Sequence, residues 1–172
     1  MSTLSRAQIF DALNRLNAEL SNASVQAECF LVGGAVMCLV LDARPATKDV
    51  DAWFTEPQAV RAAAARVATQ MGLPEDWLND AAKAFVPEGA SFEQWRSFSN
   101  LQISVADERT LLAMKCAASR SEEDRQDIAF LAHRLGLSSS QAVLDVVLQF
   151  YPAARLPVRT QLMLEEMFDE SD

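Results

Sequence analysis

An apolar segment, residues 29–41, contains two adjacent glycines, Gly33 and Gly34. The segment is too short to span a bilayer, and glycine tolerates the backbone conformations of a sharp turn. The pattern therefore predicts a short buried strand at 30–32 that leads directly into a helix at 35–41. A strand followed at once by a helix is typical of proteins in which helices cover a sheet.

The rest of the chain divides into a mixed half and a helical half, with a predicted boundary near Ala106. Up to that boundary we expect a helix at 5–20, a turn at 44–48 and a strand at 49–54. A helix at 58–71 follows, with Pro57 in its first turn and Gly72 at its end, and then a helix at 77–85 and a strand at 97–106. Beyond it we expect helices at 110–118, 124–136, 139–151 and 159–168, with Gly136 as a stop and an N-cap among Ser138–Ser140. These elements predict an α/β (α+β) fold: a small mixed sheet flanked by helices in residues 1–106, and a helical C-terminal extension, residues 107–172, packed on it.

Composition narrows the classes of function. Half of the 172 residues are apolar, so the chain can bury a core without disulfides. Cys29, Cys38 and Cys116 have apolar neighbours and no CxxC spacing, which predicts buried thiols in a reducing compartment. The N-terminal segment lacks the pattern of a signal peptide, so we expect a cytoplasmic protein without a membrane segment. A formal net charge of −9 argues against non-specific binding to DNA.

The glycine pair and two aspartates suggest a ligand. A strand that ends in Gly33-Gly34 and opens a helix leaves backbone N–H groups accessible, which favours phosphate oxygens; the alternative is a tight turn without a ligand. In the predicted strand at 49–54, Asp49 and Asp51 lie on one face, about 7 Å apart along the strand. The alternative here is an exposed edge strand with solvated acids. Two like charges on one face favour a hard divalent cation between them, Mg²⁺ or Mn²⁺, and the two motifs together favour a metal-dependent phosphate site.

Two stretches carry a resemblance to a known family. LVGGAVMCLVLDARPATKDVDAWF (31–54) resembles the start of the DNA polymerase beta-like nucleotidyltransferase superfamily, and ERTLLAMKCAASRSEEDRQDIAFLAHRLGL (108–137) is similar to its bacterial AbiEii-type branch. The resemblance implies a nucleotidyltransferase fold and Mg²⁺-dependent transfer of a nucleoside monophosphate from a nucleoside triphosphate to a hydroxyl acceptor. It also implies an RNA or protein acceptor and a toxin-like role beside an antitoxin.

The resemblance also assigns roles to individual residues. Asp49 and Asp51 bind the metal and, with Asp124, are the catalytic residues. The residues that hold the nucleotide are Gly33, Gly34, Thr47, Lys48, Lys115 and Asp127. Independently, Lys115 stands on an otherwise apolar helix, so it either reaches solvent or meets an anion. For Asp124 and Asp127 the alternative is an ion-pair network on the helix surface.

One departure from the family pattern puts catalysis in doubt. A third carboxylate usually stands on a later strand, where it activates the acceptor, whereas the polar face of the strand at 97–106 offers Gln102 and Ser104. Asp107 is the expected N-cap of the next helix. Either Asp107, Asp124 or Glu93 replaces the third carboxylate, or the reaction is slow or lost. If lost, the protein is a vestigial member of the fold that binds a protein partner.

Other chemistries lack support in the sequence. There is no Walker A loop, GxGxxG, GxSxG or HExxH motif. The single histidine, His133, has no evident metal partners and is expected at the surface near a helix end.

Overall fold

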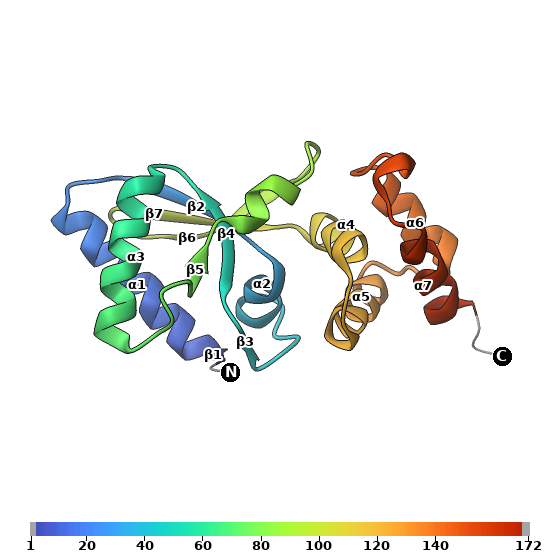
Figure 1. Ribbon diagram of the computed structural model, residues 1–172, viewed down its shortest axis with the longest axis horizontal. Helices are drawn as coiled ribbons and strands as arrows, with labels where there is room; N and C mark the ends of the chain where they lie inside the picture. Colours follow the sequence, from blue (N-terminus) through green and yellow to red (C-terminus); the bar gives the residue numbers. More distant parts are fainter. Residues whose placement is uncertain (1–2, 170–172) are drawn as a thin grey trace. The chain divides into compact units, whose positions relative to one another are not determined.

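The computed structural model describes residues 3–169 (Figure 1). Over this range the chain forms seven α-helices, a five-stranded mixed sheet and a two-stranded sheet. The polypeptide forms two compact units. The first contains the residues up to Ala84 together with Phe92–Ala106, and the second contains Phe85–Ser91 together with the residues from Asp107 onward. The mixed α/β class is confirmed, and membership of the nucleotidyltransferase fold stays a prediction.

The first unit contains most of the strands. Its elements are β1 (Leu4–Ser5), α1 (Arg6–Asn22), β2 (Ala27–Val32), α2 (Gly33–Leu39), β3 (Ala46–Thr47), β4 (Val50–Phe54), α3 (Pro57–Met71), β5 (Leu78–Asn79), β6 (Phe92–Ser97) and β7 (Leu101–Ala106). A 3-10 helix, Ala81–Phe85, follows β5 and crosses into the second unit. The predicted helices at 5–20, 35–41 and 58–71 are confirmed as α1, α2 and α3. Ser5 caps α1 together with Gln8, and α3 ends at Gly72, which has φ +65°.

The five-stranded sheet has the order β5-β4-β2-β7-β6. β2 runs parallel to β7, and β4 runs parallel to β5, whereas β2 with β4 and β6 with β7 are antiparallel. Leu31, Ala52 and Val105 lie in register across three strands and are all buried. α1 and α3 pack against each other beside the sheet and bury their apolar side chains (Figure 1). One face of the sheet thus forms the core with these helices, and its other face remains half exposed.

Two predictions for the first unit are corrected. The predicted helix at 77–85 is wrong: Leu78–Asn79 forms β5 beside β4, and only the 3-10 turn at 81–85 is helical. The cause is tertiary, because Trp77 is fully buried and its indole N–H donates to the carbonyl of Ala64, 3.0 Å away. The predicted strand at 97–106 is shortened to β7 (Leu101–Ala106). The preceding edge strand β6 (Phe92–Ser97) escaped prediction, because it has no fully buried residue to mark its period.

The second unit is helical. It consists of α4 (Glu108–Ala118), α5 (Glu122–Arg134), α6 (Ser140–Leu148), a 3-10 turn at Ala153–Arg155 and α7 (Val158–Phe168). The two predicted N-caps of this unit are confirmed. Asp107 accepts from the N–H of Thr110 at 2.8 Å, and Ser139, one of the three serines at 138–140, caps α6. The four helices predicted after Ala106 are all present. Packing of this unit on the first stays a prediction.

Two further expectations concern the whole chain. Cys29, Cys38 and Cys116 are buried free thiols, as predicted. Burial raises the pKa of Cys29 and of Cys116 to about 12, so neither thiol is an activated nucleophile. Within residues 3–169, no helix combines the length and the apolar character that a membrane crossing requires.

Candidate functional site

The glycine pair lies where β2 ends and α2 begins, and both glycines face side chains of the protein. Gly33 has φ +65°, and a Cβ built there would lie 3.3 Å from Oδ2 of Asp51. A Cβ on Gly34 would lie 2.5 Å from Oγ1 of Thr47 and 3.3 Å from Nη1 of Arg44. The missing side chains therefore allow Thr47, Arg44 and Asp51 to approach the start of α2. The tight-turn alternative accounts for part of the glycine requirement.

Asp49 and Asp51 alternate with buried neighbours, as the sequence predicts. Val50 and Ala52 are buried, whereas the two aspartates are half buried. β4 begins at Val50, so Asp49 directly precedes the strand and Asp51 lies within it. Asp49 Oδ2 accepts a hydrogen bond from Nδ2 of Asn79 at 3.2 Å, and Asn79 pairs with Asp51 across β4 and β5. The sheet thus holds both carboxylates near the edge formed by β4 and β5.

The electrostatic environment of Asp49 disfavours its charged form. Burial of the carboxylate raises its pKa, and the negative charge of Asp76 raises it further. The hydrogen bond from Asn79 and the charge of Lys48 act in the opposite direction without cancelling this rise. A cation beside Asp49 would therefore be favoured, because it would stabilise the ionised carboxylate.

Aromatic side chains share the sheet face of Asp51. Trp53 is two residues further along β4 and lies opposite Phe30 of β2. Their rings stack with centroids 4.0 Å apart and an interplanar angle of 7°. Phe92 of β6 meets Phe30 edge-on, with centroids 5.4 Å apart. All three rings are half exposed, so this face presents an aromatic surface next to a carboxylate.

Lys115, Asp124 and Asp127 lie together in the second unit. Nζ of Lys115 is 2.8 Å from Oδ1 of Asp124 and 2.9 Å from Oδ2 of Asp127. The side chain of Lys115 is 15% exposed and that of Asp127 is 6% exposed. Of the two outcomes predicted for Lys115, it meets an anion, and that anion belongs to the protein. The alternative predicted for the two aspartates is therefore right about the ion pairs, but the network does not lie on the surface, because Asp127 is buried. A role of these residues in binding nucleotide stays a prediction.

Asp124 also caps helix α5. Its Oδ2 accepts from the N–H of Arg120 and from the N–H and hydroxyl of Ser121, while the N–H of Asp124 donates to the Ser121 hydroxyl. Burial alone would raise the pKa of Asp124, but the hydrogen bonds from Lys115, Arg120 and Ser121, with the charge of Lys115, lower it overall. A carboxylate with these partners is suited to a structural role and is a weak proton acceptor.

The sheet register bears on the third carboxylate. Glu93 lies opposite Val105, which is in register with Leu31 and Ala52, so Glu93 shares their face and is on the opposite face from Asp51. Glu93 is therefore excluded as a replacement. Ser104 does lie on the face of Asp51, through its pairing with Phe30. Asp107 is used as the cap of α4.

Over residues 3–169, no group of three or more His, Cys, Asp or Glu side chains is arranged to hold a metal ion.

Some residues of the site escaped sequence reasoning. Asn79 influences Asp49 from the segment in which a helix was predicted, and Asp76 lies directly before that segment, so no local signal could place them beside Asp49. Arg44 was read only as part of a turn, although its guanidinium approaches Gly34. Lys48 is exposed, while Thr47 is buried against Gly34, and His133 is exposed in the last turn of α5 as predicted.

Comparison with known proteins adds no relative. The chain matches no protein-family model, no curated protein and no solved structure. The assignments above therefore depend on the residues themselves.

Proposed function

We propose that the first unit binds a nucleoside triphosphate with Mg²⁺ or Mn²⁺ and transfers its nucleoside monophosphate to a hydroxyl acceptor. The hydroxyl oxygen bonds to the α-phosphorus, the bond between the α- and β-phosphates breaks, and pyrophosphate leaves. The observation that carries the proposal is the pair of half-buried carboxylates, Asp49 and Asp51, beside the glycine turn. Mg²⁺ in phosphoryl-transfer sites is commonly held by one or two carboxylates plus the substrate phosphates, so two protein ligands are sufficient. Such an ion would neutralise charge on the phosphates during transfer.

The neighbouring residues fit this substrate. Burial raises the pKa of Asp49, and the negative charge of Asp76 raises it further, so a divalent cation would stabilise the ionised carboxylate. The stacked pair of Phe30 and Trp53 offers a planar surface for a nucleobase on the face of Asp51. Lys48 and Arg44 supply positive charge from the segment between α2 and β4. These contributions come from one unit, so the proposal does not depend on the placement of the other.

A second candidate is a vestigial member of the fold that binds a protein partner. It is favoured by β7, which presents the hydroxyl of Ser104 on the face of Asp51 where a third carboxylate would stand. In this alternative the nucleotide binds without turnover, or does not bind.

Titration calorimetry with Mg²⁺ and each common nucleoside triphosphate tests the proposal. Asp49→Asn and Asp51→Asn each remove a charged metal ligand, and we expect about tenfold or greater loss of Mg²⁺-dependent nucleotide affinity. Asp11→Asn is the matched control, because it removes the same charge at an exposed ion pair with Arg15 in the same unit. EDTA should abolish most of the wild-type binding.

The two candidates differ in the outcome of these titrations. Wild-type Mg²⁺ and nucleotide affinity in both variants would remove the carboxylates from the site. Binding that depends on both aspartates, without transfer to RNA, protein or nucleotide acceptors, would favour the vestigial candidate.

A further inference from the structure

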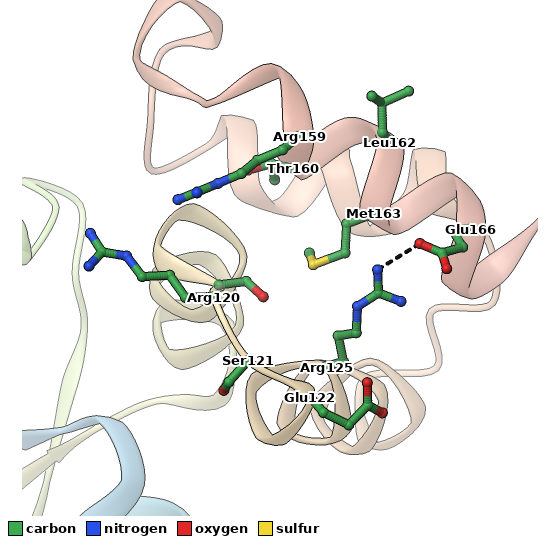
Figure 2. Close-up of a pocket in the computed structure, with 10 residues that line it drawn as sticks. Arg120, Ser121, Glu122, Arg125, Arg159, Thr160, Leu162, Met163 and Glu166 are labelled. Atoms are coloured by element: carbon green, nitrogen blue, oxygen red, sulfur yellow. Dashed lines mark hydrogen bonds and ion pairs between the residues drawn. The ribbon is translucent and has the colours of Figure 1, made fainter.

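A separate cavity lies wholly within the second unit. It has a volume of about 410 Å³ and is bounded by the connection between α4 and α5, the first turn of α5, and α7 (Figure 2). Arg120, Arg125 and Arg159 line it, together with the apolar side chains of Leu162 and Met163. None of these residues belongs to the carboxylate site of the first unit. The proposed function does not explain the cavity.

The three arginines are not equivalent. Arg125 forms an ion pair with Glu166, with 2.6 Å between Nη2 and Oε2, at the side where Met163 lies (Figure 2). Within the described residues, the side chains of Arg120 and Arg159 form no ion pair and no hydrogen bond. In Figure 2 both side chains extend away from the ion pair of Arg125 and Glu166, Arg120 from the α4–α5 connection and Arg159 from α7.

Arg120 and Arg159 line one cavity without a carboxylate partner among the described residues, although the chain as a whole is acidic. The protein has a formal net charge of −9, so most cations have carboxylates available as partners. Arg15, Arg61, Arg66 and Arg134, for example, each form an ion pair. Arg120 and Arg159 instead leave their guanidinium groups available at the cavity, where an incoming anion would meet two cations from different elements.

We propose that this cavity binds a phosphate group, which bridges the guanidinium groups of Arg120 and Arg159. A carboxylate has two oxygens and is satisfied by one bidentate arginine, whereas a phosphate monoester has three terminal oxygens and a charge near −2 that suit two arginines. Met163 points into the space between α5 and α7 in Figure 2 and provides apolar surface for an organic group attached to the phosphate. Free phosphate and a phosphate monoester with an organic body share this chemistry.

Binding of inorganic phosphate to the whole protein tests the proposal. The titration uses constant ionic strength, EDTA to remove divalent ions, and amide chemical shifts of the ¹⁵N-labelled chain. We expect saturable binding at millimolar phosphate, with the shifts concentrated at 119–125 and 159–166. Arg120→Gln and Arg159→Gln should each weaken binding by about tenfold, as expected for loss of a charged hydrogen-bond donor.

Two further variants sharpen the result. Arg155→Gln removes the same charge from an exposed arginine of this unit that does not line the cavity, so binding should change by less than about twofold. Glu122→Gln removes a carboxylate that lines the cavity and should tighten binding. Both are surface substitutions, and circular dichroism confirms that each variant is folded.

A comparison of adenosine monophosphate with inorganic phosphate distinguishes the two sources of the phosphate group. Tighter binding of the monophosphate, lost in Arg159→Gln, would indicate an organic monoester, and equal binding would indicate free phosphate. The proposal is overturned if phosphate does not saturate the protein, or if Arg155→Gln weakens binding as much as the two cavity variants. These measurements omit divalent ions, so failure here is separate from failure of the metal-dependent site.

Discussion

The two units each hold a pair of aspartates, and the pairs are neutralised differently. In the second unit, Asp124 and Asp127 share the ammonium group of Lys115 at 2.8 and 2.9 Å. In the first unit, Asp49 receives a neutral amide hydrogen bond from Asn79, and Asp76 adds a like charge nearby. The pKa of Asp124 is lowered overall, although burial opposes the change, whereas burial raises the pKa of Asp49. The helical pair is thus an internal ion-pair network, whereas the environment of Asp49 in the strand pair favours an external cation.

This difference matters because both pairs were assigned to one nucleotide site. Two carboxylates within 3 Å of Lys115 neutralise most of its positive charge. To bind a phosphate, Lys115 would have to break its ion pairs with these carboxylates. The strand pair has no comparable internal cation at Asp49 in the part of the chain described, since the charge of Lys48 does not offset burial. The physical case for a ligand is therefore stronger in the first unit.

The largest expected effect comes from breaking the helical network. Lys115→Met keeps the length and apolar stem of the side chain but removes the ammonium group that the buried Asp127 and the partly buried Asp124 share. We expect a loss of about 2–3 kcal/mol in the free energy of unfolding, measured by urea denaturation at pH 7. Lys83→Met, at an exposed lysine, should change it by less than about 0.5 kcal/mol. A loss below 1 kcal/mol for Lys115→Met, roughly the worth of a surface pair, would mean that the network is solvated.

A smaller loss is expected at the turn beside the strand pair. Gly34→Ala places a Cβ 2.5 Å from Oγ1 of Thr47, so the buried threonine must move, and we expect a loss of about 1–2 kcal/mol. Thr47→Ala in the same chain should recover part of that loss, which a double-mutant cycle measures. Gly89→Ala is the matched control, since a Cβ there would have no neighbour closer than 3.8 Å. Equal stability of the Gly34 and Gly89 variants would show that the turn has room for a side chain.

The smallest expected effect has the opposite sign. The pKa of Asp49 is raised on folding, so the folded state binds the proton more tightly, and the resulting stabilisation is present below the unfolded pKa and is lost as pH rises through the folded pKa. At pH 7 the ionised Asp49 is therefore unfavourable. Asp49→Asn should raise the free energy of unfolding by about 0.5 kcal/mol, a small value because solvent screens a half-exposed carboxylate.

The same linkage makes the two pairs distinguishable by pH. The gain in Asp49→Asn should shrink as pH falls toward about 4, near the ordinary aspartate pKa, because wild-type Asp49 then becomes neutral. Asp124 has a lowered pKa, so its contribution is present above the unfolded pKa and is lost as pH falls through the folded pKa. Urea denaturation of both aspartate-to-asparagine variants at several pH values measures this contrast. Parallel pH profiles would contradict the opposite shifts.

Local signals in the sequence predicted much of the fold. Apolar residues at helical spacing placed six of the seven α-helices of the described residues, and the glycine pair placed α2. Asp107, the serine run 138–140 and Gly72 marked helix ends that the structure confirms. The alternation around Val50 placed the two strand aspartates beside buried neighbours. These signals are readable because a helix turn, a cap or a strand period involves residues only a few positions apart.

The sequence by itself therefore determined the seven α-helices of the described residues, the strands β2, β4 and β7, their approximate ends, and the α/β character of the chain. The tertiary structure decided which side chains meet: Asn79 with Asp49, Thr47 with Gly34, and two unpaired arginines from α7 and the α4–α5 connection at one cavity. It also decided that Lys115 meets Asp124 and Asp127, where the sequence left solvent or an anion open. The physical reason is that local periodicity says which residues face inward, whereas the partners they find there depend on packing between distant segments and on the burial that shifts their charges.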